Sequence, residues 1–268
     1  MQNELGMMIG ASPQGKSPGF TLLELLIVMS LIALLLAVLM PGLDGARRQA
    51  KLTLCQSNIR QLALANSLYA QESGGAYVAG AAEFLKNLHR WHGRRASLNE
   101  PFVAAYGLLT PYLGPDGAIR ACPAFEPPGS GFEVGNGGYG YNNAYVGVQT
   151  VTDVRGRTLV VSDRSGTAAD RIRHPGETVM FTDAAFAAGD LIEYSFCEPR
   201  FHPRYQSRAD PSIHFRHLAA ASVAWCDGHV THERRTFSWS SGFYEGSPQR
   251  HGIGWFGNTD DNQLFDLD

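Results

Sequence analysis

Histidine and aspartate side chains are concentrated in the C-terminal part of the chain, where they could bind a divalent metal. His217, Asp227 and His229 can meet if a hairpin folds back onto the segment before it. His214 and His232 lie nearby in the sequence. However, an Asp-Gly pair commonly builds a tight hairpin turn, and residues 229 and 232 of a two-stranded ribbon point to opposite faces. A structural hairpin is the simpler explanation, so the sequence predicts no metal site here and no catalytic residue.

The acidic end of the chain offers oxygen ligands of a different kind. Asp260, Asp261, Asp266 and Asp268, together with loop carbonyls, could hold Ca²⁺. The pattern does not match an EF-hand loop, and a solvated acidic end is the simpler explanation. Calcium, with Asp260, Asp261 and Asp266 as its candidate ligands, is the one cofactor considered, and otherwise no cofactor is expected.

The four cysteines, Cys55, Cys122, Cys197 and Cys226, are far apart in the sequence. No C-x-x-C pair is present, which argues against a zinc ribbon or a thioredoxin-type redox site. In an exported protein this even number permits up to two disulfides with three connectivities. All four are therefore disulfide candidates, and the pairing is left open.

Composition excludes several classes of function. The net charge of −3 provides no basic field for nucleic acid. No P-loop, nucleophile elbow or dinucleotide fingerprint is found. The 268 residues suffice for one or two domains, and 30 glycines and 14 prolines indicate a loop-rich body with short strands.

An apolar run from Phe20 to Met40 is interrupted by one carboxylate, Glu24. At 1.5 Å per residue, a helix over this run covers roughly 30 Å, the thickness of a bilayer core. An ordinary signal peptide has a shorter apolar run, with a small-residue cleavage site after it. A plain signal anchor has no use for Glu24, because a charge in hydrocarbon is expensive and usually functional.

The segment from Lys16 to Glu24 resembles the class III signal of type IV pilins and type II secretion pseudopilins. The resemblance implies cleavage after Gly19, removal of a leader of residues 1–19, and N-methylation of Phe20. It implies that Glu24 pairs with the free amine of its own or a neighbouring subunit, and that the helix softens at Pro41. Major pseudopilins also bind calcium in a C-terminal loop, which adds weight to the aspartates above.

A second helical pattern predicts that the apolar helix continues as an amphipathic one. Leu52, Cys55, Ile59, Leu62, Asn66 and Tyr69 share one face, and Ser73-Gly74-Gly75 ends the helix. The predicted spine covers residues 20–73, with a transmembrane half at 20–40. Residues 74–268 are predicted to form an α+β head with a small antiparallel sheet, short helices at 81–88 and 103–113, and strands at 139–148, 158–162 and 178–182.

The spacing of His217, nine residues and then Asp227-Gly228 resembles the H-x9-DG domain (residues 217–228) of many pilin-like proteins. Residues 222–226 and 229–232 are predicted to be the strands of this hairpin, joined by a type I′ turn at Asp227-Gly228. The helix segment 55–62 and the pair Cys122-Pro123 resemble other parts of the same group.

We therefore predict a pilin-like α+β structural subunit, a pseudopilin or minor pilin of a type II secretion or type IV pilus-related filament, and not an enzyme. The expected partners are other spine helices, a prepilin peptidase that cuts and methylates, and an inner-membrane assembly platform. The expected location is the bacterial inner membrane, crossed once, with the head in the periplasm or on a surface filament. The alternatives are a membrane-anchored metal-dependent hydrolase that uses the C-terminal histidines, and a pilus-displayed adhesin.

Overall fold

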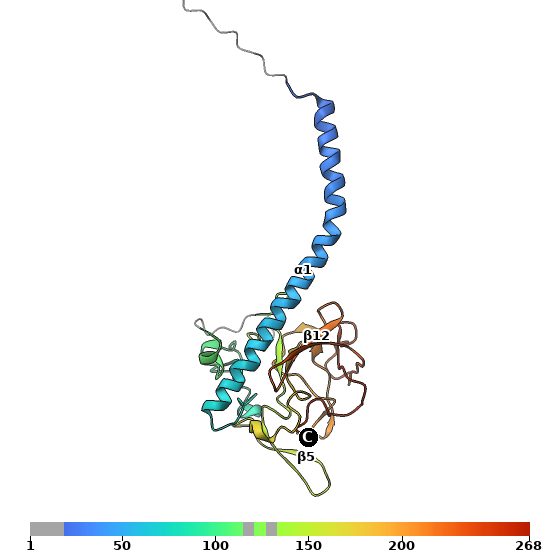
Figure 1. The fold of residues 1–268 in the computed structure, drawn as a ribbon. Coiled ribbons are helices and arrows are strands. Elements are labelled where there is room, and N and C mark those ends of the chain that lie inside the picture. The colour runs from blue at the N-terminus through green and yellow to red at the C-terminus, as the bar shows by residue number, and fades with distance from the viewer. Residues whose placement is uncertain (1–18, 115–120, 127–132) are drawn as a thin grey trace, which may run out of the picture. The chain divides into compact units, whose positions relative to one another are not determined.

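The computed structural model describes residues 19–114, 121–126 and 133–268. The predicted leader, residues 1–19, lies outside the described residues except for Gly19. The chain divides into two compact units, residues 1–46 and 47–268. One helix, α1 (Leu22–Glu72), runs through the boundary between them (Figure 1).

The first part of α1 buries none of its side chains within this chain. Every residue from Gly19 to Lys51 is exposed, although most of those up to Met40 are leucine, isoleucine, valine or alanine. In the described part of the chain, α1 is the one helix long and apolar enough to cross a membrane. The helix is continuous through Pro41, and softening at this proline stays a prediction.

The second part of α1 packs into the head with the face that the sequence predicts. Leu52, Cys55, Ile59, Leu62 and Asn66 are all buried, and Tyr69 is half-buried. This confirms the three- and four-residue spacing as a core-facing stripe. The helix ends at Glu72 and is followed by two glycines with positive φ, 66° at Gly74 and 87° at Gly75, a left-handed conformation that glycine adopts without strain.

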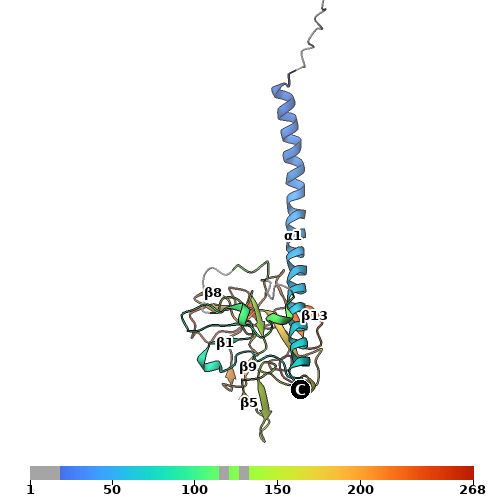
Figure 2. The ribbon, with the colours of Figure 1, turned by 90° about the vertical axis from the view of Figure 1, so that its left-hand side faces the viewer.

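The head contains short strands and single turns of 3₁₀ helix joined by long loops (Figure 2). The four 3₁₀ turns are η1 (Phe84–Lys86), η2 (Ala104–Tyr106), η3 (Thr110–Tyr112) and η4 (Ala169–Arg171). The strands are β1 (His89–Arg90), β2 (Gly93–Arg94), β3 (Tyr139–Tyr141), β4 (Gln149–Thr152), β5 (Thr158–Ser162), β6 (Val179–Asp183), β7 (Phe186–Ala188), β8 (Asp190–Ile192), β9 (Phe201–His202), β10 (Ser207–Arg208), β11 (Ile213–His214), β12 (Ala220–Trp225), β13 (Val230–Arg234) and β14 (Ile253–Gly254).

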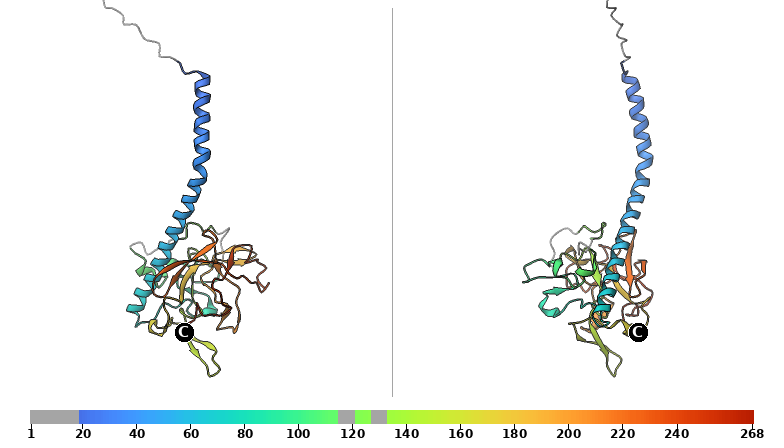
Figure 3. Two further views of the ribbon diagram at one scale, coloured as in Figure 1. Left: turned by 45° about the vertical axis from the view of Figure 1, so that its right-hand side comes forward. Right: turned by 60° about the vertical axis from the view of Figure 1, so that its left-hand side comes forward.

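The largest sheet has four antiparallel strands in the order β13-β12-β6-β3 (Figure 3). Every residue of β6 and β12 is buried, so both faces of the sheet centre are covered. Two tyrosines of β3 contact the soluble part of α1: the Tyr139 hydroxyl lies 3.5 Å from Cys55 Sγ, and the Tyr141 hydroxyl lies 3.0 Å from Asn66 Nδ2. This arrangement confirms the predicted α+β class, a long helix packed on a head with small antiparallel sheets.

Several local predictions for the head were wrong in their boundaries. Short 3₁₀ turns replace the predicted helices: one turn lies in the segment 81–88 and two lie in 103–113. In the second segment, Gly107 leaves the helical conformation with ψ 139° and Pro111 follows it, so no longer helix forms. The strand predicted at 139–148 stops at Tyr141, because Asn142 donates to the carbonyls of Val179 and Phe265 and turns the chain. The strand predicted at 158–162 is confirmed as β5.

Candidate functional site

Glu24 is a helix-capping residue in the structure. Its Oε2 accepts hydrogen bonds from the Thr21 backbone N–H (2.9 Å) and hydroxyl (2.8 Å). In return, the Glu24 N–H donates to the Thr21 hydroxyl oxygen at 3.2 Å. This reciprocal pattern is a capping box, with Thr21 as the N-cap and Glu24 three residues later. The carboxylate is therefore held at the N-terminus of α1. This helix begins at Leu22, two residues after Phe20, so the carboxylate lies close to the Gly19-Phe20 bond at which the sequence predicts cleavage.

The sequence analysis missed Thr21, although a signal for it was present. A threonine followed three residues later by glutamate, before an apolar run, is the sequence pattern of a capping box. The same four residues thus carry two features: the local start of α1 and the predicted assembly carboxylate. Pro41, the other predicted assembly residue, lies inside the exposed part of α1.

The turn that positions His217 lies directly after it and was not predicted. Leu218 (φ 52°) and Ala219 (φ 63°) are both left-handed, and His217 exchanges two backbone hydrogen bonds of 2.9 Å with Ala220. This is a type I′ geometry built without glycine, which costs about 1–2 kcal/mol for each left-handed L-residue. The His217 carbonyl also accepts a hydrogen bond from His232 Nε2 at 3.0 Å.

The predicted type I′ turn at Asp227-Gly228 was wrong. Only Gly228 has a positive φ, 90°, and its N–H bonds to the Trp225 carbonyl at 2.9 Å. The hairpin of β12 and β13 therefore has a three-residue loop that ends in a left-handed glycine. The Asp227 side chain turns back on its own loop, where its Oδ1 bonds to the N–H (3.0 Å) and Nδ1 (2.6 Å) of His229.

The structure does not bring His217, Asp227 and His229 together. Asp227 and His229 pair at the surface, with side chains 41% and 44% exposed, and the His229 ring stacks on Trp225. The His217 side chain is instead buried among residues from three other segments. The spacing from His217 to Asp227-Gly228 thus separates a buried histidine from the turn of a surface hairpin.

Four residues of metal-ligating types, His217 among them, converge in the head. Cys55 from α1, Cys122 from the loop before β3, Asp183 from the end of β6 and His217 from the turn before β12 place one ligand atom each within 4.8 Å of all the others. We call this set the Cys2AspHis cluster. Cys55 Sγ lies 3.1 Å from Asp183 Oδ1, Cys122 Sγ lies 3.3 Å from His217 Nε2, and His217 Nε2 lies 3.5 Å from Asp183 Oδ2.

Neighbouring groups fix the carboxylate of the Cys2AspHis cluster. The Ser222 backbone N–H donates to Asp183 Oδ2 at 2.7 Å, and Arg216 Nη2 lies 3.5 Å from Asp183 Oδ1. The Arg216 guanidinium also covers the Phe125 ring and donates to the carbonyls of Gly138 and Ala184. The cluster is therefore a buried polar network with the Arg216 guanidinium held against it.

The cluster perturbs the pKa values of its members in opposite directions. Burial would raise the pKa of Asp183, but Arg216 and His217 lower it to about 2. The hydrogen bond from Cys55, with support from His217 and Arg216, lowers the pKa of Cys122 to about 5, while the same bond and burial raise that of Cys55. Asp183 and Cys122 overcome the effect of burial and raise the pKa of His217 to about 9.

The four disulfide candidates are all free and buried cysteines in the structure. Cys55 contacts the Asp183 carboxylate, and Cys122 contacts the His217 imidazole. Cys197 and Cys226 lie outside the cluster, and burial raises the pKa of each thiol.

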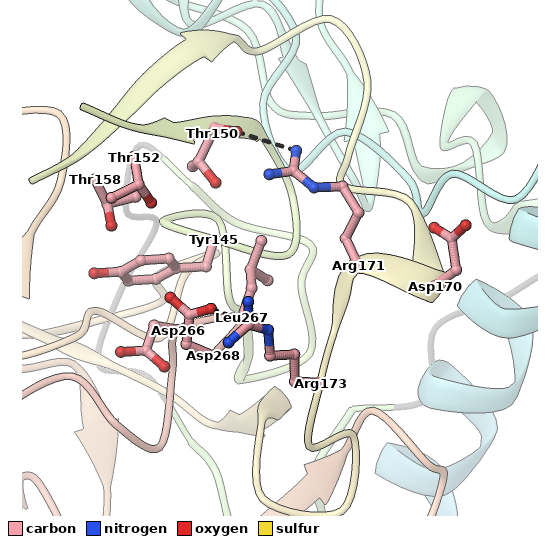
Figure 4. Close-up of a pocket in the computed structure, with 10 residues that line it drawn as sticks. All are labelled: Tyr145, Thr150, Thr152, Thr158, Asp170, Arg171, Arg173, Asp266, Leu267 and Asp268. Atoms are coloured by element: carbon pink, nitrogen blue, oxygen red, sulfur yellow. Dashed lines mark hydrogen bonds and ion pairs between the residues drawn. The ribbon is translucent and has the colours of Figure 1, made fainter. Parts of the chain in front are cut away.

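The three candidate calcium ligands have different partners in the structure. Asp260 is occupied by Arg200 and Arg208, at 3.4 and 2.6 Å, and Asp261 bonds to Thr259 at 2.9 Å. Asp266 instead lines a pocket of about 440 Å³, where Figure 4 shows it beside Asp268 and Arg173 below the β4–β5 hairpin. Burial raises the pKa of Asp266 to about 6, which disfavours the ionised form that a cation needs.

Comparison with known proteins identifies the N-terminal segment. Residues 15–40 match the family model described as the prokaryotic N-terminal methylation motif. Comparisons with the curated proteins and with the solved structures found no significant match. The motif supports a pilin-type subunit, processed by a prepilin peptidase and assembled with other pilin subunits, and it points to a structural protein rather than an enzyme. Together with the single apolar helix, it is compatible with a protein anchored in the membrane by one span.

Proposed function

We propose that this protein is a pseudopilin or minor pilin of a type II secretion or type IV pilus-related filament. The observation that carries the proposal is the methylation motif at residues 15–40, which leads into a helix with wholly exposed apolar side chains. Such a helix needs a bilayer before assembly and neighbouring helices afterwards. The predicted head, residues 74–268, would then lie in the periplasm or on the filament surface.

The capping box provides hydrogen-bond partners for the Glu24 carboxylate before assembly. Its carboxylate is satisfied locally by the two Thr21 donors, which lowers the penalty of placing it in the membrane. Cleavage after Gly19 would create an ammonium group on Phe20, next to the held carboxylate. The amine of the same or an adjacent subunit could then pair with Glu24, and such a pair in a low dielectric would set the axial register of packed spines.

The chemistry of the head favours this structural role over the hydrolase alternative. Asp227 and His229 pair with each other at the surface, and His217 belongs to a different, buried group. A catalytic metal keeps an open coordination position, whereas all four residues of the Cys2AspHis cluster are buried. We therefore place the function in the anchor and spine, with the head as the part that distinguishes this subunit from others.

Intact-mass measurement of the protein extracted from membranes tests the processing step. The expected mass corresponds to loss of residues 1–19 and addition of one methyl group at Phe20. A Gly19→Leu variant should accumulate in the uncut form, because the enlarged side chain lies at the scissile bond. A full-length wild-type chain, or a chain cut after Met40, would refute the proposal.

The assembly role of the capping box is tested by incorporation into filaments sheared from cells. Glu24→Ala should be cleaved normally but should enter filaments less well, because the ammonium of Phe20 loses its partner. Thr21→Val removes the hydroxyl from the cap at nearly constant volume, and Thr21→Ser retains it. Thr53→Val is the matched control, since Thr53 is an exposed helix threonine that bonds only to the Gln49 carbonyl one turn earlier. Wild-type incorporation of Glu24→Ala would refute the register argument.

A further inference from the structure

We propose that Cys55, Cys122, Asp183 and His217 form a structural zinc site that ties the soluble part of α1 to the head. These residues come from four segments that are distant in the sequence, yet one ligand atom of each lies within 4.8 Å of the other three. The sequence predicts no metal here, because no two of these residues are close enough in the chain to form a recognisable motif.

The distances in the cluster suit a tetrahedral ion. Zinc binds sulfur at about 2.3 Å and nitrogen or oxygen at about 2.0–2.1 Å, so a regular tetrahedron of these ligands has edges of about 3.3–3.8 Å. The Cys122–His217 and Asp183–His217 pairs, at 3.3 and 3.5 Å, fall in this range. Cys55 Sγ lies 3.1 Å from the other Asp183 oxygen, Oδ1, which therefore belongs to a different choice of ligand atom. With one ligand atom per residue, all four atoms lie within 4.8 Å of one another, so the side chains would have to move inward by about 1 Å at most to hold the ion.

The donor set selects zinc among the divalent metals. Two thiolates and an imidazole are soft or borderline ligands that suit Zn²⁺, whereas Ca²⁺ and Mg²⁺ require mainly oxygen. With both cysteines deprotonated and His217 neutral, the four ligands carry three negative charges. One zinc ion and the Arg216 guanidinium, 3.5 Å from Asp183, would neutralise them. A buried site with no net charge avoids the main penalty of burying ions.

Burial makes the proposed site structural rather than catalytic. The exposed fractions are 0% for Cys55, 1% for Cys122, 0% for Asp183 and 3% for His217. Four protein ligands without an open position are typical of structural zinc, which contributes its binding free energy to folding. Neighbours that orient the ligands are already present: the Ser222 N–H and Arg216 contact Asp183, and the Tyr139 hydroxyl donates to Cys55.

A disulfide between Cys55 and Cys122 is the main rival in an oxidising compartment. Oxidation would remove the Cys55 thiol that donates to Asp183 and the Cys122 sulfur as a hydrogen-bond partner of His217 Nε2. A buried carboxylate and a buried imidazole would then each lose a partner, which carries a desolvation penalty. Zinc instead uses all four side chains, so the geometry favours the metal over the disulfide.

The test is elemental analysis of the full chain extracted from membranes in detergent and purified without chelators or metal-affinity resin. About one zinc ion per chain is expected. After removal of zinc by a chelator, Co²⁺ should bind in its place. The product should show the intense visible bands of a tetrahedral ion and a thiolate-to-cobalt charge-transfer band. This readout uses the wild-type chain and does not depend on whether a variant folds.

The four cysteines supply matched variants. Cys55→Ser and Cys122→Ser should lose the bound zinc and the charge-transfer band, whereas Cys197→Ser and Cys226→Ser, at equally buried positions outside the cluster, should retain both. Chelation should lower the melting temperature of the wild type but not that of Cys122→Ser.

Three results would overturn the proposal: no bound metal with four free thiols, a mass two hydrogens lower that indicates a Cys55–Cys122 disulfide, or zinc lost equally from the Cys197→Ser control. None of these readouts depends on cleavage after Gly19. Failure of the zinc site and failure of the pilin assignment are therefore distinguishable.

Discussion

Asn66 should be the most sensitive polar residue of the spine, because it joins α1 to two other segments. Its Oδ1 accepts the Val78 backbone N–H at 2.9 Å, and its Nδ2 donates to the Tyr141 hydroxyl at 3.0 Å. The Tyr141 hydroxyl in turn donates to the Val78 carbonyl at 3.1 Å. Asn66 is fully buried, so water cannot replace these bonds without a rearrangement.

Asn66→Ala should lower the free energy of unfolding of the head by about 2–4 kcal/mol. The Val78 N–H would be left buried without an acceptor, at a penalty of about 1–3 kcal/mol, and the bond to Tyr141 would contribute about 1 kcal/mol more. For a domain of this size, 1 kcal/mol moves the melting temperature by about 2–4 °C, so the expected decrease is about 10 °C. That is a large part of the typical total stability, about 5–15 kcal/mol.

Urea unfolding of the full chain in detergent, followed by tryptophan fluorescence, measures this loss. Trp91 is a suitable reporter, since it is fully buried and packs edge-on against the Tyr141 ring, 6.4 Å between centroids. The control is Ser67→Ala, one residue along, whose half-buried hydroxyl bonds only to the Ala63 carbonyl of the same helix. A Tyr141→Phe double-mutant cycle should give about 1 kcal/mol of coupling with Asn66. The reasoning fails if Asn66→Ala lies within 1 kcal/mol of Ser67→Ala.

Three further predictions concern the head. Ala219→Gly should stabilise it by about 0.5–1 kcal/mol in urea unfolding, because glycine relieves the positive φ of 63°; destabilisation would contradict the strained turn. Burial lowers the pKa values of His92 and His214 to about 3. The unfolded chain therefore binds more protons than the folded head below pH 6.5, so the free energy of unfolding is highest above pH 6.5 and decreases as the pH falls. Each histidine should remove about 2 kcal/mol between pH 7 and pH 5, so replacement of either histidine by glutamine should remove that part of the pH dependence of stability, and an unchanged profile in such a variant would disagree. Glu133→Gln should destabilise the head by about 3–5 kcal/mol in urea unfolding, because it leaves the buried Arg90 guanidinium, 2.9 Å away, without its counter-charge; a loss below about 1 kcal/mol would count against a structural ion pair.

The sequence predicts those parts of the molecule in which spacing along the chain determines position in space. A helix repeats every 3.6 residues, so the buried stripe that includes Cys55, Ile59 and Asn66 could be read directly. The strand β5 and the stop after Glu72 follow from similarly local signals. The capping box of Thr21 and Glu24 is local as well, and the pattern that predicts it was present in the sequence.

The remainder depends on contacts between distant segments, which no local pattern encodes. The turn after His217 consists of leucine and alanine, residues that do not signal a left-handed turn, while the Asp-Gly pair that does signal one adopts another geometry. Asp183 belongs to a buried strand and Cys122 to a loop, and they meet Cys55 only because β6 lies beside β3 under the helix. Sheet order, rather than residue spacing, assembles the candidate metal site.

The two parts of α1 differ in what contacts them, because the first part is exposed and the second part is buried in the head. The part before Leu52 offers only exposed side chains, so no described residue of this chain covers its apolar surface. The part after Leu52 is held by polar contacts as well as by apolar burial: Asn66 is bonded to the chain beyond the helix end, and Cys55 is bonded to the sheet. Directional contacts fix the rotation of a helix about its axis more strictly than apolar packing, which tolerates rearrangement. A zinc ion at Cys55 would strengthen this constraint and fix the face of the spine from which the head projects.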